Sequence, residues 1–214
     1  MNKKFLKDYF INSIYGCDER MISFSATFYQ KLLIGLLFIT MPFILFGISE
    51  TEGIDNKRLL IGIDLFPSFL ASDKNIQHKV GDDHHLHIVI AYQYEEQIAN
   101  DMAQRLESLK KIRGISIKVV IYSVQDFDKL EYIEDQTIAG LFIAESMIPL
   151  NQIIKLSIKK QFIVFSPFQG DVEKGVAGGI YITEKILPYI NMKTLREANI
   201  KMKSFFLRVS KKYE

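Results

Sequence analysis

Between residues 58 and 183 the chain alternates short apolar, often β-branched runs with segments whose apolar residues recur every three or four positions. Runs of the first kind are typical of buried strands, and the second spacing is typical of amphipathic helices. The expected strands are residues 58–63, 86–92, 115–122, 137–144, 161–166 and 178–183, and the expected helices are residues 95–112, 149–159 and one from Thr194. Strands that alternate with helices predict a mostly parallel sheet in a three-layer α/β sandwich.

The last of these helices carries the clearest start signal. Thr194 and Glu197 have the spacing of a capping box, in which a hydroxyl and a carboxylate each accept a hydrogen bond from a backbone N–H group. Apolar residues then follow from Leu195 to Val209, and the opposite face is rich in lysine. We expect this basic face to be a solvated surface rather than a binding patch. Gly114 is expected to end the helix at residues 95–112.

A nearly unbroken apolar run lies near the N-terminus, within residues 32–48. Positive charges precede it, so the domain that follows is expected to face outward across a membrane. One interpretation is a secretory signal peptide that is cleaved after Ser49. Another is an uncleaved inner-membrane anchor, although the run is short of the roughly 20 residues of a spanning helix. A third is a helix buried in a soluble core, which would need cover on every side.

This run sets the expected domain organisation: a leader at residues 1–49 and a single α/β domain at residues 58–214. Met21 offers an alternative start that would give the leader a conventional length. The single cysteine, Cys17, precedes the run. Disulfides, zinc thiolates and cysteine nucleophiles are therefore excluded from the exported domain. We expect a periplasmic protein, free or anchored in the inner membrane, that touches the membrane only through its N-terminal segment.

Charge gives no support for nucleic-acid binding. The chain has 27 Lys and Arg against 25 Asp and Glu. Five of these basic residues and three of the acidic ones lie in the first 49 residues, which leaves 22 of each sign in the remainder. A nucleic-acid-binding domain usually carries a concentrated basic face, so no nucleic-acid partner is expected.

A histidine-rich cluster precedes the expected strand at residues 86–92. His85 and His87 alternate and could project from one side of the strand start, with Asp82 or Asp83 as a third metal ligand. His78 is the only histidine outside the cluster. We therefore favour a polar turn that leads into a strand, with His85 and His87 as a weak metal candidate.

Four glycines in the stretch GDVEKGVAGGIYI, residues 170–182, raise the question of a phosphate-binding loop. Such a loop opens into a helix, whereas Gly178 and Gly179 run directly into a strand-like segment. They are expected instead to allow either a positive φ or a close backbone approach. The sequence also contains no Gly-x-Ser-x-Gly elbow and no Walker pattern. We expect no enzymatic activity and no cofactor.

Several short sequence motifs mark the C-terminal region. They are Ser166 at a strand end, Gly178-Gly179 before a strand, Ile190-Asn191 before a helix, and Ala198 with Ser204-Phe205-Phe206-Leu207. In these features the chain resembles the YfiR/HmsC-like family of periplasmic proteins, over roughly residues 59–213. The resemblance implies that the family-motif residues are structural, namely Gly175, Gly178, Gly179, Asn191, Thr194, Glu197 and Ser204.

The resemblance also implies a small Rossmann-like domain without catalytic activity. Characterised relatives bind the periplasmic sensor part of an inner-membrane diguanylate cyclase and repress it, which lowers cyclic-di-GMP and biofilm formation. The implied partner is an inner-membrane sensor protein, a diguanylate cyclase or a histidine kinase, and a homodimer is allowed. The redox switch of several relatives does not carry over, because no cysteine follows residue 17.

A second interpretation is a periplasmic small-ligand or solute-binding protein that serves a transporter or a sensor kinase. Ser166, Gln169 and Asp171 follow an expected parallel strand. Ligands commonly bind at the carboxyl ends of such strands, so these three residues are the candidate ligand-binding set.

Overall fold

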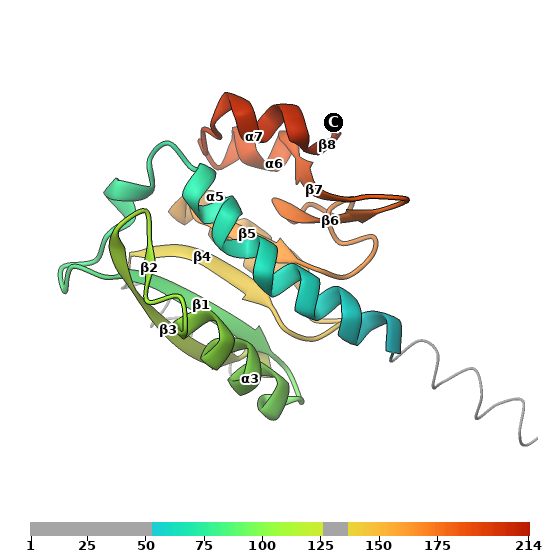
Figure 1. Cartoon of the computed structure of the whole chain (residues 1–214), viewed down its shortest axis with the longest axis horizontal. Coiled ribbons are helices and arrows are strands. Elements are labelled where there is room, and N and C mark those ends of the chain that lie inside the picture. Colours follow the sequence, from blue (N-terminus) through green and yellow to red (C-terminus); the bar gives the residue numbers. More distant parts are fainter. Residues whose placement is uncertain (1–52, 126–136) are drawn as a thin grey trace, which may run out of the picture. The chain divides into compact units, whose positions relative to one another are not determined.

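The computed structural model describes residues 53–125 and 137–214, and an eight-stranded sheet organises them (Figure 1). The strands are β1 Leu86–Tyr92, β2 Lys111–Ile112, β3 Ile115–Ser123, β4 Ile138–Ile143, β5 Ile163–Ser166, β6 Gly178–Ile182, β7 Ile186–Asn191 and β8 Lys211–Tyr213. Their order is β2-β3-β1-β4-β5-β6-β7-β8. The pairs β2–β3 and β6–β7 are antiparallel, and all other neighbours are parallel. The predicted mixed α/β fold with a mostly parallel sheet is confirmed.

Helices cover this sheet. They are η1 Ile76–Lys79, α3 Glu96–Glu107, α5 Leu150–Lys160, α6 Met192–Glu197, α7 Ser204–Val209 and a long helix at residues 53–72. From β1 the chain passes through α3 to β3, and from β4 through α5 to β5, in opposite directions along the sheet. Because such connections are right-handed, α3 and α5 lie on opposite faces. Arg105 of α3 pairs with Asp64 of the long helix at 2.7 Å, so these two helices share a face (Figure 1).

The long helix corrects the first predicted strand, at residues 58–63. Leu59, Ile63, Phe66 and Leu70 recur at helical spacing and are all at most 4% exposed. The ring of Phe66 lies 5.6 Å from that of Phe142 and 5.4 Å from that of Phe165, on β4 and β5. A proline inside a helix costs about 3 kcal/mol. Burial of several large apolar side chains, at about 1.5–3 kcal/mol each, outweighs that cost, so the helix continues past Pro67.

The helix predicted at residues 95–112 ends early. α3 stops at Glu107, and Lys111–Ile112 pair antiparallel with β3. Arg113 and Gly114 form the two-residue turn between them, both with positive φ (53° and 83°). Such a pair is typical of a type I′ hairpin turn. Gly114 therefore turns a hairpin rather than ending a helix.

The capping box predicted at Thr194 and Glu197 is wrong. Asn191 caps α6, since its side chain accepts a hydrogen bond from the Thr194 N–H group at 2.9 Å. The Thr194 hydroxyl instead donates to the Gly175 carbonyl at 2.8 Å, and Glu197 lies 4.0 Å from Lys193. The predicted single helix is also interrupted after α6, where Asn199 has a φ of 52°, and α7 is a separate helix.

The predictions for the leader at residues 1–49, including the apolar run at 32–48, Cys17 and Met21, lie outside the described residues. The described chain from Gly53 onward forms one compact unit. Within residues 53–125 and 137–214, no helix has both the length and the apolar character needed to cross a membrane.

Candidate functional site

The topology singles out the carboxyl ends of β1 and β4. These strands are neighbours, and the chain leaves them in opposite directions, toward β3 and toward β5. In open α/β sheets ligands bind in the crevice at such a switch point. Here the switch point is bordered by residues 93–95, which follow β1, and by residues 145–147, which follow β4.

Glu145 bridges the two segments at this switch point. Its Oε2 atom accepts hydrogen bonds from the backbone N–H groups of Gln93, Tyr94 and Glu95 at 2.9, 2.8 and 3.1 Å. These groups lead into α3, and the positive end of the helix dipole attracts an anion to them. A carboxylate of the chain itself therefore takes the position in which an anionic ligand would bind.

Sequence reasoning missed this role, because Glu145 lies just after the expected strand at residues 137–144 and was not among the candidate site residues. Its partners lie 50 to 52 residues upstream. The available signal was an acidic residue directly after a buried strand, and it becomes informative only when β4 is known to lie beside β1. Two exposed apolar side chains, Tyr94 at 70% and Met147 at 95%, belong to the two segments that Glu145 connects.

Ser166 and Asp171, two of the three predicted ligand-binding residues, lie together but bind each other. The Ser166 hydroxyl is fully buried, donates to Asp171 Oδ2 at 2.7 Å and accepts from the Phe168 N–H group at 3.2 Å. The other carboxylate oxygen of Asp171 is 3.0 Å from Lys174 Nζ. Gln169 is exposed. A ligand role for these residues stays a prediction, and their internal hydrogen bonds do not favour it.

Two further buried side chains hold the same loop, residues 167–177. Arg58, from the long helix, donates to the carbonyls of Pro167 at 2.7 Å and Ile180 at 3.2 Å. Burial lowers the pKa of Arg58, and the carboxylates of Asp55, Asp171 and Glu173 oppose that shift. From the other end, Asn191 Nδ2 donates to the Val172 carbonyl at 2.8 Å. The polar side chains around this loop therefore stabilise its conformation.

The glycines of this region allow close packing. A Cβ atom on Gly178 would lie 2.4 Å from the Phe69 ring, and one on Gly179 would lie 2.7 Å from the Ser166 carbonyl oxygen. Gly175 has a φ of 115°, which side chains rarely adopt. Of the two alternatives predicted for Gly178 and Gly179, the close approach is confirmed, whereas neither residue has a positive φ. Ser204, another family-motif residue, is the exposed first residue of α7.

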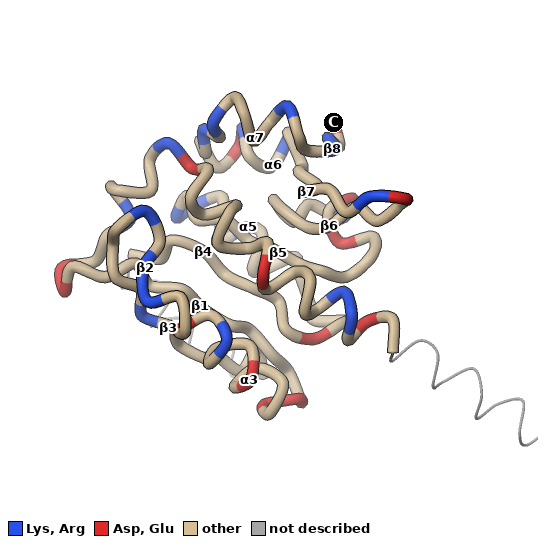
Figure 2. The backbone as a smooth tube through the Cα atoms, in the orientation of Figure 1, with Lys and Arg blue, Asp and Glu red and all other residues tan. Residues whose placement is uncertain are grey.

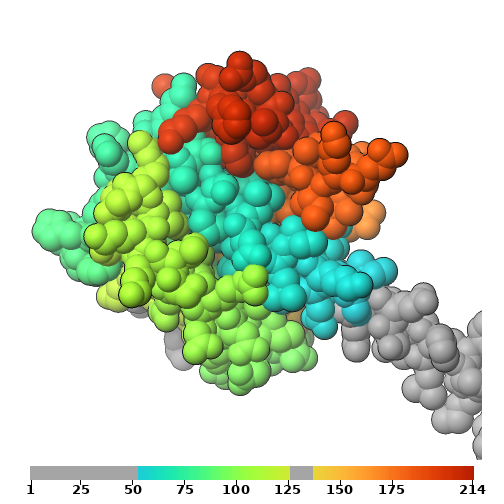
Figure 3. Space-filling view, viewed as in Figure 1, coloured from blue at the N-terminus to red at the C-terminus, as the bar shows by residue number. Residues whose placement is uncertain are grey.

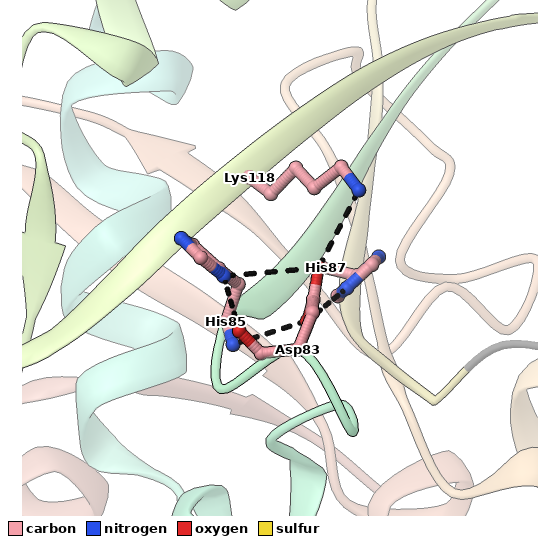
Figure 4. A network of polar contacts seen from close by, with 4 residues as sticks. All are labelled: Asp83, His85, His87 and Lys118. Carbon is pink, nitrogen blue, oxygen red and sulfur yellow. Dashed lines mark hydrogen bonds and ion pairs between the residues drawn. The ribbon is translucent and has the colours of Figure 1, made fainter.

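The histidine cluster gathers around Asp83 (Figure 4). Asp83 Oδ1 lies 2.9 Å from His87 Nε2, and Asp83 Oδ2 lies 3.7 Å from His85 Nδ1 and 3.4 Å from Lys118 Nζ. These neighbours, the His87 hydrogen bond first, hold the pKa of Asp83 far below its usual range. Across residues 53–125 and 137–214, no three histidine, cysteine or acidic side chains are arranged to hold a metal ion. The geometry fits a polar turn that is closed by Asp83.

Comparisons with known proteins identify no family. No protein-family model matches the chain, and no curated protein matches it. Among solved structures it is similar to "the ABC domain in complex with L-Trp from Streptococcus pneumonia", with a TM-score of 0.46 and 9% identity. The match covers 67% of this chain and 59% of that one, so the chain spans less than two thirds of the matched structure. A likeness this weak supports no conclusion about the site.

Proposed function

We propose that this protein is a non-enzymatic regulator that acts by binding another protein. The proposal rests on one observation. The polar groups at the carboxyl ends of the strands already form hydrogen bonds with other groups of the same chain. Glu145 takes three backbone donors at the switch point, and Ser166 and Asp171 bind each other. A small molecule would have to displace these contacts, whereas a protein partner can use the outer surface.

The proposed partner is the periplasmic part of an inner-membrane signalling protein, a diguanylate cyclase or a histidine kinase. The resemblance to the YfiR/HmsC-like family supports this choice, together with the apolar run at residues 32–48 that precedes the domain. Binding would repress the partner and so lower cyclic-di-GMP and biofilm formation. The three-layer, Rossmann-like domain would serve as a scaffold for this surface.

A test compares cells that lack the gene with cells that carry it. We expect deletion to raise cyclic-di-GMP, and the full chain to restore the lower level. Gly178→Val supplies a control that fails to fold, because its side chain would overlap the Phe69 ring. Unchanged cyclic-di-GMP and unchanged sensor-kinase output on deletion would overturn the proposal.

A second candidate, the binding of a small anionic solute, is favoured by the three converging N–H groups at the switch point. In this case the ligand carboxylate would replace the Glu145 carboxylate. Thermal shift measurements with a panel of amino acids and small carboxylates separate the two candidates. Stabilisation of the wild-type protein by one of these compounds would favour the solute-binding function, and stabilisation by none would favour the regulator.

A further inference from the structure

The outer edge of β8 is open. β8 is the last strand in the sheet order, and among the described residues no strand pairs with its outer side. Lys211, Lys212 and Tyr213 are all exposed. Because an edge strand presents backbone N–H and C=O groups without strand partners, it is a template for an added strand from another chain.

The surface around this edge is basic. From residue 193 to residue 214 the chain carries seven basic and two acidic side chains: Lys193, Arg196, Lys201, Lys203, Arg208, Lys211 and Lys212 against Glu197 and Glu214. Figure 2 shows these basic positions along α6, α7 and β8. Figure 3 shows the same C-terminal residues, in red, as an outer surface beside the long helix. The described domain is otherwise close to charge balance, so the basic excess is local.

The side chains of β8 alternate between the two faces of the sheet. Lys211 and Tyr213 share one face, where the Lys211 ammonium group is 5.5 Å from the centre of the Tyr181 ring. The ring of Tyr213 lies 6.5 Å from that of Tyr189 on β7. Lys212 lies on the opposite face. An added strand would therefore have one lysine of β8 beside each of its two faces. On one face it would also lie beside a row of tyrosines.

The two lysines of β8 determine which charge an added strand must carry. Opposite charges on neighbouring strands are stabilising, and like charges directly opposite each other are destabilising. A second copy of the chain, paired through the same edge, would place lysine against lysine. An acidic strand would place a carboxylate beside Lys211 on one face and beside Lys212 on the other.

We propose that the β8 edge is the docking site for an extended acidic segment of the partner protein, which joins the sheet as an additional strand. This inference rests on the proposed function, since it names the surface that the partner would use. Main-chain hydrogen bonds supply sequence-tolerant affinity, and the lysines select an acidic segment. The tyrosine row offers contact to an apolar side chain between two acidic ones.

Fluorescence anisotropy on the full-length protein tests the proposal with a labelled peptide of repeated Glu-Glu-Val units, which places carboxylates on both faces of an extended strand. We expect this peptide to bind, with an affinity that falls as salt rises, and the matched peptide of Gln-Gln-Val units to bind much more weakly. The double variant Lys211→Glu/Lys212→Glu should weaken binding at least about tenfold, since both charge pairs become repulsive. The matched control Lys110→Glu/Lys111→Glu changes the net charge equally at two consecutive exposed positions at β2, the other end of the sheet order, and should leave binding unchanged.

A second peptide separates strand addition from simple charge attraction. N-methylation of alternate residues removes the main-chain donors along one edge without changing the charge, and it should abolish binding. Equal binding of the methylated peptide would overturn the proposal. So would binding to phosphatidylglycerol vesicles, but not to the acidic peptide, with the same dependence on Lys211 and Lys212.

Measurements of cyclic-di-GMP and kinase output in cells distinguish failure of the docking-site proposal from failure of the proposed function. If deletion of the gene changes cyclic-di-GMP or kinase output but Lys211→Glu/Lys212→Glu does not, the docking site is wrong and the regulatory function stands. If neither the deletion nor the variant changes either signal, the regulatory function itself is wrong.

Discussion

Replacement of Glu145 by alanine tests the interpretation of the switch point. The variant removes the carboxylate that accepts three backbone N–H groups before α3. Loss of a capping acceptor at a helix start costs about 0.5–2 kcal/mol. Loss of a negative charge near the positive end of the helix dipole adds about 0.3–1 kcal/mol. Because the site is half exposed, water can replace part of the contact, and we expect a loss of about 2 kcal/mol in the free energy of unfolding.

In a domain of this size, a loss of about 2 kcal/mol lowers Tm by about 4–8 °C. Differential scanning calorimetry measures this shift, and amide hydrogen exchange locates it. The amides of Gln93, Tyr94 and Glu95 should lose protection, because their acceptor is gone. Glu96→Gln is the matched control, since it removes a charge from the first turn of the same helix and none of the three hydrogen bonds. An unchanged Tm together with unchanged protection of these amides would refute the role given to Glu145.

Three further predictions concern the loop and the histidine cluster. Gly178→Ala should cost about 2–3 kcal/mol, because its Cβ atom would lie 2.4 Å from the buried Phe69 ring, and urea denaturation measures the loss. Asn191→Ala should cost about 1–3 kcal/mol, since it removes the α6 cap and the hydrogen bond to the Val172 carbonyl; a change below about 0.5 kcal/mol would contradict this. The folded state holds the pKa of Asp83 below its unfolded value, so Asp83 stabilises the fold above about pH 4, and this contribution is lost at lower pH. The urea midpoint of Asp83→Asn should therefore fall below that of the wild type at pH 7, and the gap should close toward pH 3.

The central strands could be predicted because they are buried on both faces. β1, β4 and β5 are almost continuous apolar runs, as is typical of strands in a parallel sheet that is covered on both faces. The long helix was missed because residues 58–63 alone also read as an apolar run. Its helical period emerges only when Phe66 and Leu70, on either side of Pro67, are included. β8 was missed because its two lysines continued the basic face of an expected helix.

The contacts at the candidate site could not be predicted from local sequence patterns. Ser166 and Asp171 were correctly placed at and after the carboxyl end of a strand, but their hydrogen bond to each other depends on how the loop folds back. The contacts of Glu145 depend on the order of the strands, and several orders are compatible with the same alternation of helices and strands. Contacts between residues far apart in the sequence, rather than local secondary-structure propensity, therefore determine which polar groups remain available to a ligand.

Photo-crosslinking in living cells tests the central claim most directly. A photoreactive amino acid replaces Tyr213, at the β8 edge, in one strain, and Met147, beside the switch point, in another. The account predicts a crosslink from position 213 to an acidic segment of an inner-membrane signalling protein, and no such crosslink from position 147. A crosslink to that protein from position 147, with none from position 213, would contradict it.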